Sequence, residues 1–273
     1  MVSCSTGCFE VSTTIFPYTS WNTPYVHTAF GNGAATCAGV ETAYQALKKR
    51  GTITDEIKFV NFAGDGGTYD IGLQALSGAM ERGHKMVFVC LNNEAYMNTG
   101  IQRSSATGKG ASTTTSCAGS VDPGKKEFPK DMTQIMVAHG IPFVAQGAPH
   151  AWKDLVSKSN KAFNCNGPSF INAIAPCPRG WRFASDQTIA ISRLAAETCI
   201  WPLYEVVDGT EYLLSGESLR IAEDKQEKKP ITDWINSQGR FKHLKDPKWA
   251  SVVESIQKET DRKWKTLLRL ARL

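Results

Sequence analysis

Two apolar runs of strand length, each ending in a polar turn, constrain the fold of this chain more than any other feature. The first, residues 59–63, leads into Gly-Asp-Gly-Gly at residues 64–67, and the second, residues 85–91, leads into Asn-Asn-Glu at residues 92–94. A helix-compatible segment at residues 70–83 lies between them. Strand, helix and strand with short connections form a βαβ unit, which predicts parallel strands and a right-handed crossover. Continuous apolar strands are typical of a sheet with helices on both faces.

The rest of the chain alternates in the same way. An amphipathic helix is predicted to end at Gly51, and Asp208-Gly209 between two β-rich runs predicts a hairpin. Residues 8–30 are predicted to be irregular, and residues 99–131 to form a long polar loop. Further helices are predicted at residues 132–140, 151–164, 188–201 and from Pro247 onward, and further strands at residues 142–147 and 168–176. The predicted fold class is α/β: a doubly wound, mostly parallel sheet followed by a helical C-terminal tail.

The composition bounds the class of protein. With 273 residues, 41% of them hydrophobic and 21% charged, the chain can bury the core of one large α/β domain. No apolar run approaches the roughly 20 residues that cross a bilayer, and residues 1–4 do not begin a signal peptide, so we expect a cytoplasmic protein without membrane contact. The net charge of +5 is mild, and much of the basic excess lies beyond residue 220. A solvated surface or a docking site for an acidic partner explains it better than nucleic-acid binding.

The glycine-rich turn at residues 64–67 is the first candidate site. Ligands of open α/β sheets bind beyond the carboxyl ends of the strands, and glycines let backbone N–H groups approach an anion closely. Asp65 would repel a phosphate unless a divalent cation lay between them. Asn93 and the carbonyl of Ala95, after the next strand, offer further oxygens, so the two strand ends predict a Mg²⁺–diphosphate site. An ordinary tight turn is one alternative, and a Rossmann dinucleotide site, which would need Gly-x-Gly-x-x-Gly, is another.

Longer stretches resemble a known family. Gly-Asp-Gly followed one strand later by Asn resembles the signature of thiamine diphosphate enzymes. Four stretches of the sequence closely resemble the β subunit of 2-oxoacid:ferredoxin oxidoreductases, nearest to the pyruvate-specific (pyruvate synthase) branch. They are STGCFEVSTTIFPYTSW, AGDGGTYDIGLQALSGAMERGH, NNEAYMNTGIQRS and INAIAPCPRGW. The resemblance covers nearly the whole chain. We expect a thiamine-diphosphate-binding domain at residues 1–200, and at residues 201–273 a hairpin and helical tail that dock on partner subunits.

The resemblance implies a role for each residue that matches the family motifs. Asp65, Asn93 and the carbonyl of Ala95 would bind Mg²⁺. Asn98 would be the catalytic residue and would contact the substrate carbonyl or carboxylate, with a turn-capping Asn as the alternative. The residues implied to bind the cofactors are Cys8, Gly64, Asp65, Gly66, Gly67, Asn93, Glu94, Ala95, Tyr96, Met97 and Asn98.

The cysteines match the family only in part. The resemblance implies that Cys8 and Cys177 are thiolate ligands of a [4Fe–4S] cluster; buried thiols are the alternative. The chain has eight cysteines but no Cys-x-x-Cys pair, whereas the family takes two further ligands from such a pair before the equivalent of Cys8. We therefore expect the natural N-terminus to lie upstream of Met1. The alternative is a chain without the cluster.

The implied activity is oxidative decarboxylation of pyruvate with coenzyme A to acetyl-CoA and CO₂, with electrons passing to ferredoxin. The implied partners are an α subunit that completes the thiamine site, ferredoxin-like γ and δ subunits, and soluble ferredoxin. Another 2-oxoacid (2-oxoglutarate, a branched-chain acid or oxalate) is the alternative substrate. A non-oxidative thiamine enzyme usually has a longer chain. A non-catalytic assembly subunit is disfavoured by the intact Asp65, Asn93 and Asn98.

Overall fold

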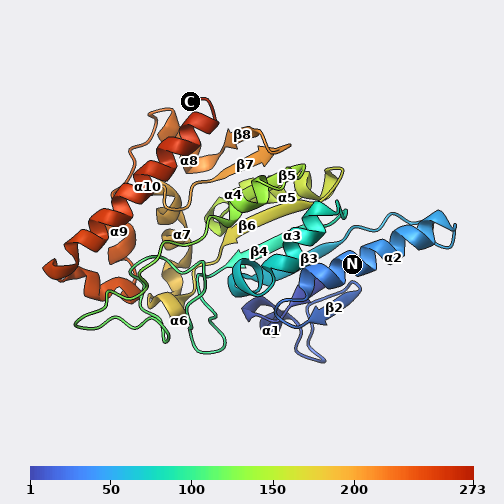
Figure 1. The fold of residues 1–273 in the computed structure, drawn as a ribbon, viewed down its shortest axis with the longest axis horizontal. Helices are drawn as coiled ribbons and strands as arrows, with labels where there is room; N and C mark the ends of the chain where they lie inside the picture. Colours follow the sequence, from blue (N-terminus) through green and yellow to red (C-terminus); the bar gives the residue numbers. More distant parts are fainter.

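An eight-stranded sheet in the order β2-β1-β3-β4-β6-β5-β7-β8 forms the centre of the computed structural model, which describes all 273 residues (Figure 1). The first six strands are parallel, β7 is antiparallel to β5, and β8 is antiparallel to β7. The strands are β1 Val2–Ser5, β2 Tyr25–Thr28, β3 Val60–Gly64, β4 Val87–Asn92, β5 Phe143–Gly147, β6 Ser169–Ile174, β7 Tyr204–Val207 and β8 Glu211–Leu214.

Ten α-helices surround the sheet. They are α1 Cys8–Thr13, α2 Gly33–Lys49, α3 Leu73–Glu81, α4 Met132–Val137, α5 Trp152–Asn164, α6 Pro178–Trp181, α7 Thr188–Glu197, α8 Gly216–Ala222, α9 Ile231–Asn236 and α10 Ala250–Leu270. A single π-helical turn, Gly66–Asp70, connects β3 to α3. None of the helices combines the length and the apolar character that crossing a membrane would require.

The core divides between the two faces of the sheet. Successive residues of a strand point to opposite faces, and accordingly Phe88 and Phe170 belong to one buried cluster while their neighbours Val87 and Ile171 belong to another. The first cluster includes residues of α2, α3, α4 and α10, and the second includes Ala162 of α5. Helices therefore cover both faces, which confirms the predicted doubly wound class.

The predicted βαβ unit is confirmed by the structure. β3 and β4 pair in parallel, with Ala63 opposite Cys90 and Gly64 opposite Leu91. The predicted hairpin is also present: residues 208–210 connect β7 to β8, and Asp208 and Gly209 in this turn have positive φ angles of 48° and 68°. Both hairpin strands extend the main sheet, so the sheet continues past residue 200.

The prediction for residues 8–30 was wrong in part, because this segment contains α1 and β2. β1 was missed altogether. Its sequence, Val-Ser-Cys-Ser, has weak strand propensity, yet all four residues are buried between β2 and β3. The long loop at residues 99–131 has no helix or strand, as predicted. It lies against the C-terminal segment, where the Ser112 N–H donates to the Arg240 carbonyl at 3.0 Å (Figure 1).

Candidate functional site

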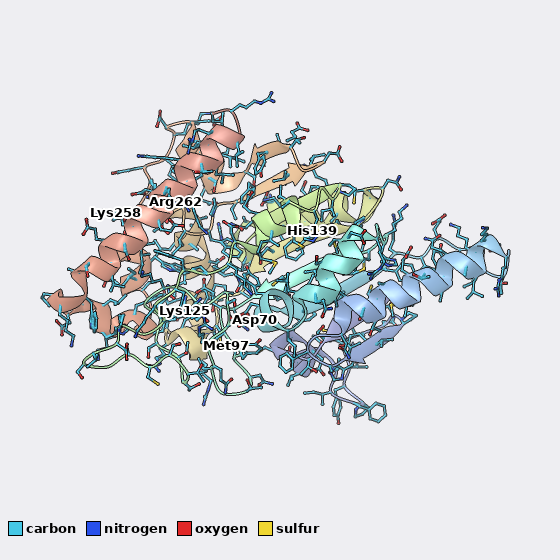
Figure 2. The ribbon with its side chains drawn as sticks, in the orientation of Figure 1. Asp70, Met97, Lys125, His139, Lys258 and Arg262 are labelled. Atoms are coloured by element: carbon cyan, nitrogen blue, oxygen red, sulfur yellow. The ribbon has the colours of Figure 1, made fainter.

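The two predicted turns meet at one edge of the sheet. Because β3 and β4 are adjacent and parallel, residues 64–67 and residues 93–99 follow strand ends that lie side by side. They line a common pocket with the start of α1; Figure 2 labels Asp70, Met97 and Lys125 around this end of the sheet. The lining residues are Thr6, Gly7, Cys8, Phe30, Gly64, Asp65, Gly66, Gly67, Asn93, Ala95, Tyr96, Met97, Asn98 and Thr99.

Asp65 is the charged group at the base of this pocket. Its side chain is buried, and burial raises the pKa of its carboxyl from 3.8 to about 7. Three donors act against this rise: the Ser104 hydroxyl, 2.5 Å from Oδ2, the N–H of Asp65 itself, and the Asn93 N–H, 3.3 Å from Oδ1. A buried carboxylate whose pKa stays raised despite these donors favours a proton or a cation beside it.

The side chain of Asn93 faces the same point in space. In one orientation of its amide, Nδ2 donates to Asp65 Oδ1 at 3.0 Å and to the Ala95 carbonyl oxygen at 2.7 Å. In the other orientation Oδ1 takes that position with only the Ala95 N–H, at 3.4 Å, to donate to it, so the first orientation satisfies the hydrogen bonds of the protein better. A cation at this point would reverse the preference, because Oδ1 could then join the Asp65 and Ala95 oxygens as a ligand.

Glu94 differs from its neighbours. Its φ angle is 63°, in the left-handed region that side chains other than Gly rarely adopt. Its carboxylate points away from the pocket and lies 2.8 Å from the guanidinium of Arg240, which is itself buried. Glu94 is absent from the residues that line the pocket. The Trp181 indole N–H donates to the carbonyl of Asn93 at 2.8 Å, so both residues of the turn are held from the C-terminal half of the chain.

Gly66 is required by the close approach of Tyr96. A Cβ atom at position 66 would lie 2.1 Å from Cε1 of the Tyr96 ring. The Tyr96 hydroxyl lies 3.2 Å from the Gly66 carbonyl oxygen and 3.3 Å from Oδ2 of Asp70. Burial, together with Asp70, raises the pKa of Tyr96 to about 12, so the ring remains a neutral donor.

Cys8 and Cys177 lie close enough to influence each other. Cys8 is exposed, yet desolvation by neighbouring groups raises the pKa of its thiol, and the nearby Cys177 raises it further. Cys177 caps α6, accepting a hydrogen bond from the Gly180 N–H at 3.4 Å. No group of three or more His, Cys, Asp or Glu side chains is arranged to hold a metal ion. Cys8 and Cys177 are therefore a pair of neighbouring thiols without a third metal-ligating group beside them.

A larger cavity of about 340 Å³ lies behind the turn, between Tyr69, Trp201 and α10. Of the predicted site residues only Glu94 lines it, and its polar lining combines neutral groups such as Asn172 with charged groups such as Asp131 and Lys263. We place the site in the smaller pocket because it gathers the glycines, the carboxylate and the thiol.

Several residues of the site escaped sequence reasoning. Thr6 and Gly7 line the pocket from just before the segment that was predicted to be irregular, and Phe30 lines it from the end of that segment. Ser104 stands in the long polar loop, whose length was a signal of function. Nothing in the sequence pointed to Arg240.

Comparisons with known proteins agree with this geometry. Residues 5–173 match the family described as Thiamine pyrophosphate enzyme, C-terminal TPP binding domain. Pyruvate synthase subunit PorB of Thermotoga maritima is 46% identical over 273 residues, covering 99% of this chain and 82% of that protein. Pyruvate synthase subunit PorB of Methanocaldococcus jannaschii is 48% identical over 98% of this chain and 86% of its own length. The chain belongs to the PorB family of pyruvate synthase subunits.

A solved structure extends the comparison to the fold of this PorB-family chain. The 2-oxoglutarate:ferredoxin oxidoreductase from Magnetococcus marinus, with 2-oxoglutarate, coenzyme A and succinyl-CoA bound, aligns with a TM-score of 0.54 and 22% identity. The alignment covers 66% of this chain and 58% of that one. At this identity the likeness concerns the fold alone. The chain therefore carries a thiamine pyrophosphate binding domain with the fold found in a 2-oxoacid:ferredoxin oxidoreductase.

Proposed function

We propose that this chain is the thiamine-diphosphate- and Mg²⁺-binding β subunit of a pyruvate:ferredoxin oxidoreductase. The proposed reaction is the oxidative decarboxylation of pyruvate with coenzyme A to acetyl-CoA and CO₂, with ferredoxin as the electron acceptor. The observation that carries the proposal is the convergence of the Asp65 carboxylate, the Asn93 side-chain amide and the Ala95 carbonyl in the glycine-lined pocket of a PorB-family chain.

The oxygen set fits Mg²⁺. In an octahedral site with Mg²⁺–oxygen distances of about 2.0–2.1 Å, neighbouring ligand oxygens lie about 2.9 Å apart. The side-chain amide atom of Asn93 that faces the two oxygens lies 3.0 Å from Asp65 Oδ1 and 2.7 Å from the Ala95 carbonyl oxygen, close to this spacing. In the proposed site, these three groups would hold the ion and the diphosphate would complete its coordination.

The glycines fit the diphosphate. Backbone N–H groups of residues 64–67 would donate to it, and at Gly64 no heavy atom lies within 4 Å of the place a Cβ would take. When bound, thiamine diphosphate supplies a nucleophilic carbon and an electron sink for decarboxylation. Asn98 is exposed at the edge of the pocket, where its amide would orient the carbonyl or carboxylate of the substrate. Met97 would contact the thiazolium.

The cluster fits this chain only in part. A [4Fe–4S] cluster takes four thiolates, and Cys8 and Cys177 would supply two of them. The other two would come from residues outside this sequence.

The proposed partners are an α subunit, which would complete the thiamine site, the ferredoxin-like γ and δ subunits, and ferredoxin. The exposed edge of the pocket, from Asn98 to Gly100, supports a site that a second chain closes. The segment at residues 201–273 would contribute docking surface, and we propose a cytoplasmic location.

The test is pyruvate-dependent reduction of ferredoxin by the complex purified without oxygen, with and without coenzyme A, together with bound thiamine, magnesium and iron. We expect stoichiometric thiamine diphosphate and loss of its binding in the D65N variant. A complex that reduces ferredoxin equally well when it carries D65N would contradict the proposal.

A branched-chain 2-oxoacid is the second candidate substrate. Ketoisovalerate oxidoreductase subunit VorB of Pyrococcus horikoshii is 41% identical over 97% of this chain, so the motifs alone do not separate the two substrates. The ratio of kcat/KM for pyruvate and for 2-oxoisovalerate, measured on the same complex, decides between them.

A further inference from the structure

We propose that Arg240 is a positioning residue for the metal site, acting through its buried ion pair with Glu94. The pair fixes the turn at residues 93–95, so that the Asn93 side chain and the Ala95 carbonyl face Asp65. This inference rests on the proposed Mg²⁺–thiamine diphosphate site and adds to it a residue from the distant C-terminal segment.

The guanidinium of Arg240 occupies a closed environment. The residue is 2% exposed, and its guanidinium carbon lies 4.0 Å from the centroid of the Trp181 ring and 4.9 Å from that of Phe241. Its Nε donates to the side chain of Gln238 at 2.8 Å. Glu94 is the only carboxylate paired with it: Oε2 lies 2.8 Å from Nη2, and the contact is an ion pair without hydrogen-bond geometry. A buried cation with a single anionic partner holds that partner firmly, because separating them would leave both charges desolvated.

The same cluster holds the main chain of the turn. The Trp181 indole donates to the Asn93 carbonyl at 2.8 Å, and the Thr107 hydroxyl donates to the Glu94 carbonyl at 2.6 Å. The N–H of Glu94 donates to the Asn92 side chain at 2.9 Å. The peptide groups flanking Glu94 are therefore fixed on the side away from the pocket, which leaves the Asn93 amide and the Ala95 oxygen free to point into it.

The backbone at Glu94 explains why the pair is needed. Its φ of 63° costs conformational energy for a residue with a Cβ. A glycine would adopt this angle without strain, so the presence of Glu indicates that its side chain is used. The carboxylate does not line the metal pocket, and its contact is Arg240. The ion pair thus compensates the strain of a turn that presents two metal ligands from alternate residues.

The test is a Mg²⁺ titration of the metal-free purified complex at saturating thiamine diphosphate, with bound cofactor measured by equilibrium dialysis. We expect R240M and E94Q to raise the half-saturating Mg²⁺ concentration by about 10-fold or more, the range seen when groups supporting metal ligands are removed. R240K should recover part of the loss, because it keeps the charge. Mn²⁺ substituted for Mg²⁺ should give a broadened EPR spectrum in the variants, since the ligands are less well fixed.

Two further variants separate positioning from general destabilisation. K158M removes another buried cation, whose Nζ lies 2.7 Å from Asp154 away from the pocket, and should leave the Mg²⁺ midpoint within about twofold. E94G relieves the φ strain but lacks the carboxylate, so we expect it to raise the half-saturating Mg²⁺ concentration as E94Q does. If R240M fails to assemble, E94G still tests the role of the ion pair.

Unchanged Mg²⁺ midpoints in E94Q and E94G, or an equal shift in K158M, would overturn the role of Arg240 and leave the metal site standing. A wild-type complex that binds thiamine diphosphate without any Mg²⁺ dependence would overturn the proposed site and this inference together.

Discussion

The hydroxyl of Ser104 donates a 2.5 Å hydrogen bond to Oδ2 of Asp65. This bond connects the long loop at residues 99–131 to the carboxylate at the base of the pocket. It occupies one carboxylate oxygen, so that the other is directed toward the Asn93 side chain.

Replacing Ser104 with Ala should weaken Mg²⁺-dependent binding of thiamine diphosphate by about 10-fold, because Asp65 loses the donor that orients it. The measurement is a Mg²⁺ titration of the purified complex. S105A is the matched control, since Ser105 uses its N–H to bind Asp70 and its carbonyl to bind Lys125, and both survive the substitution. Equal midpoints for S104A and S105A would show that the hydroxyl has no orienting role.

The D65N variant should be more stable than the wild type when no metal is present. Burial raises the pKa of Asp65 to about 7 from 3.8, so between these pH values the folded protein binds a proton more tightly than the unfolded chain does. The free energy of unfolding therefore falls as pH rises from about 4 to 7 through this group. Because the side-chain amide of the D65N variant is neutral at every pH, the variant keeps the free energy of unfolding that the wild type loses through this group. The difference is about 2–4 kcal/mol at pH 8.

Thermal unfolding of the metal-free protein at pH 5 and pH 8 checks this expectation. The stability of D65N relative to wild type should be larger at pH 8, and adding Mg²⁺ with thiamine diphosphate should stabilise the wild type alone. A D65N protein that is less stable than wild type at pH 8 without metal would show that the carboxylate is satisfied by the fold itself.

Much of the site follows from local sequence. The apolar run before Gly64 and the one before Asn92 identify two adjacent parallel strands, and the rule that ligands bind at strand ends brings Asp65 and Asn93 together. The structure bears out that convergence, since both residues line one pocket. Their chemical roles remain predictions.

The supporting contacts could not be predicted in this way. Asn93 and Trp181 are 88 positions apart in the sequence, and Ser104 comes from a loop without periodicity. Arg240 lies in a segment with many basic residues, and the sequence alone does not distinguish a buried arginine from the exposed ones around it. Such pairs depend on how whole elements pack, which no local pattern records.

Replacing Gly66 with Ala should destabilise the protein and abolish cofactor binding. The new methyl group would lie 2.1 Å from the Tyr96 ring, so the ring must move and lose its contact with Asp70. Overpacking of this kind costs about 1–3 kcal/mol. G39A is the control: Gly39 lies in α2 with no atom near its Cβ position, and the substitution should stabilise by about 0.5–1 kcal/mol. Thermal unfolding of both variants decides.

Removing iron should change the reactivity of Cys8. If Cys8 and Cys177 are cluster ligands, iodoacetamide should not modify Cys8 in the iron-loaded complex, and should modify it after anaerobic chelation of the iron.

The raised pKa of Cys8 keeps the free thiol protonated at neutral pH, so its alkylation should accelerate as pH rises toward and beyond 9.0. Cys117 is exposed and serves as the reference thiol. Peptide mass mapping gives both rates. Because thiolate bound to iron is not free to attack the reagent, equal alkylation of Cys8 before and after chelation would exclude it as a ligand, while leaving the Mg²⁺–thiamine diphosphate site untouched.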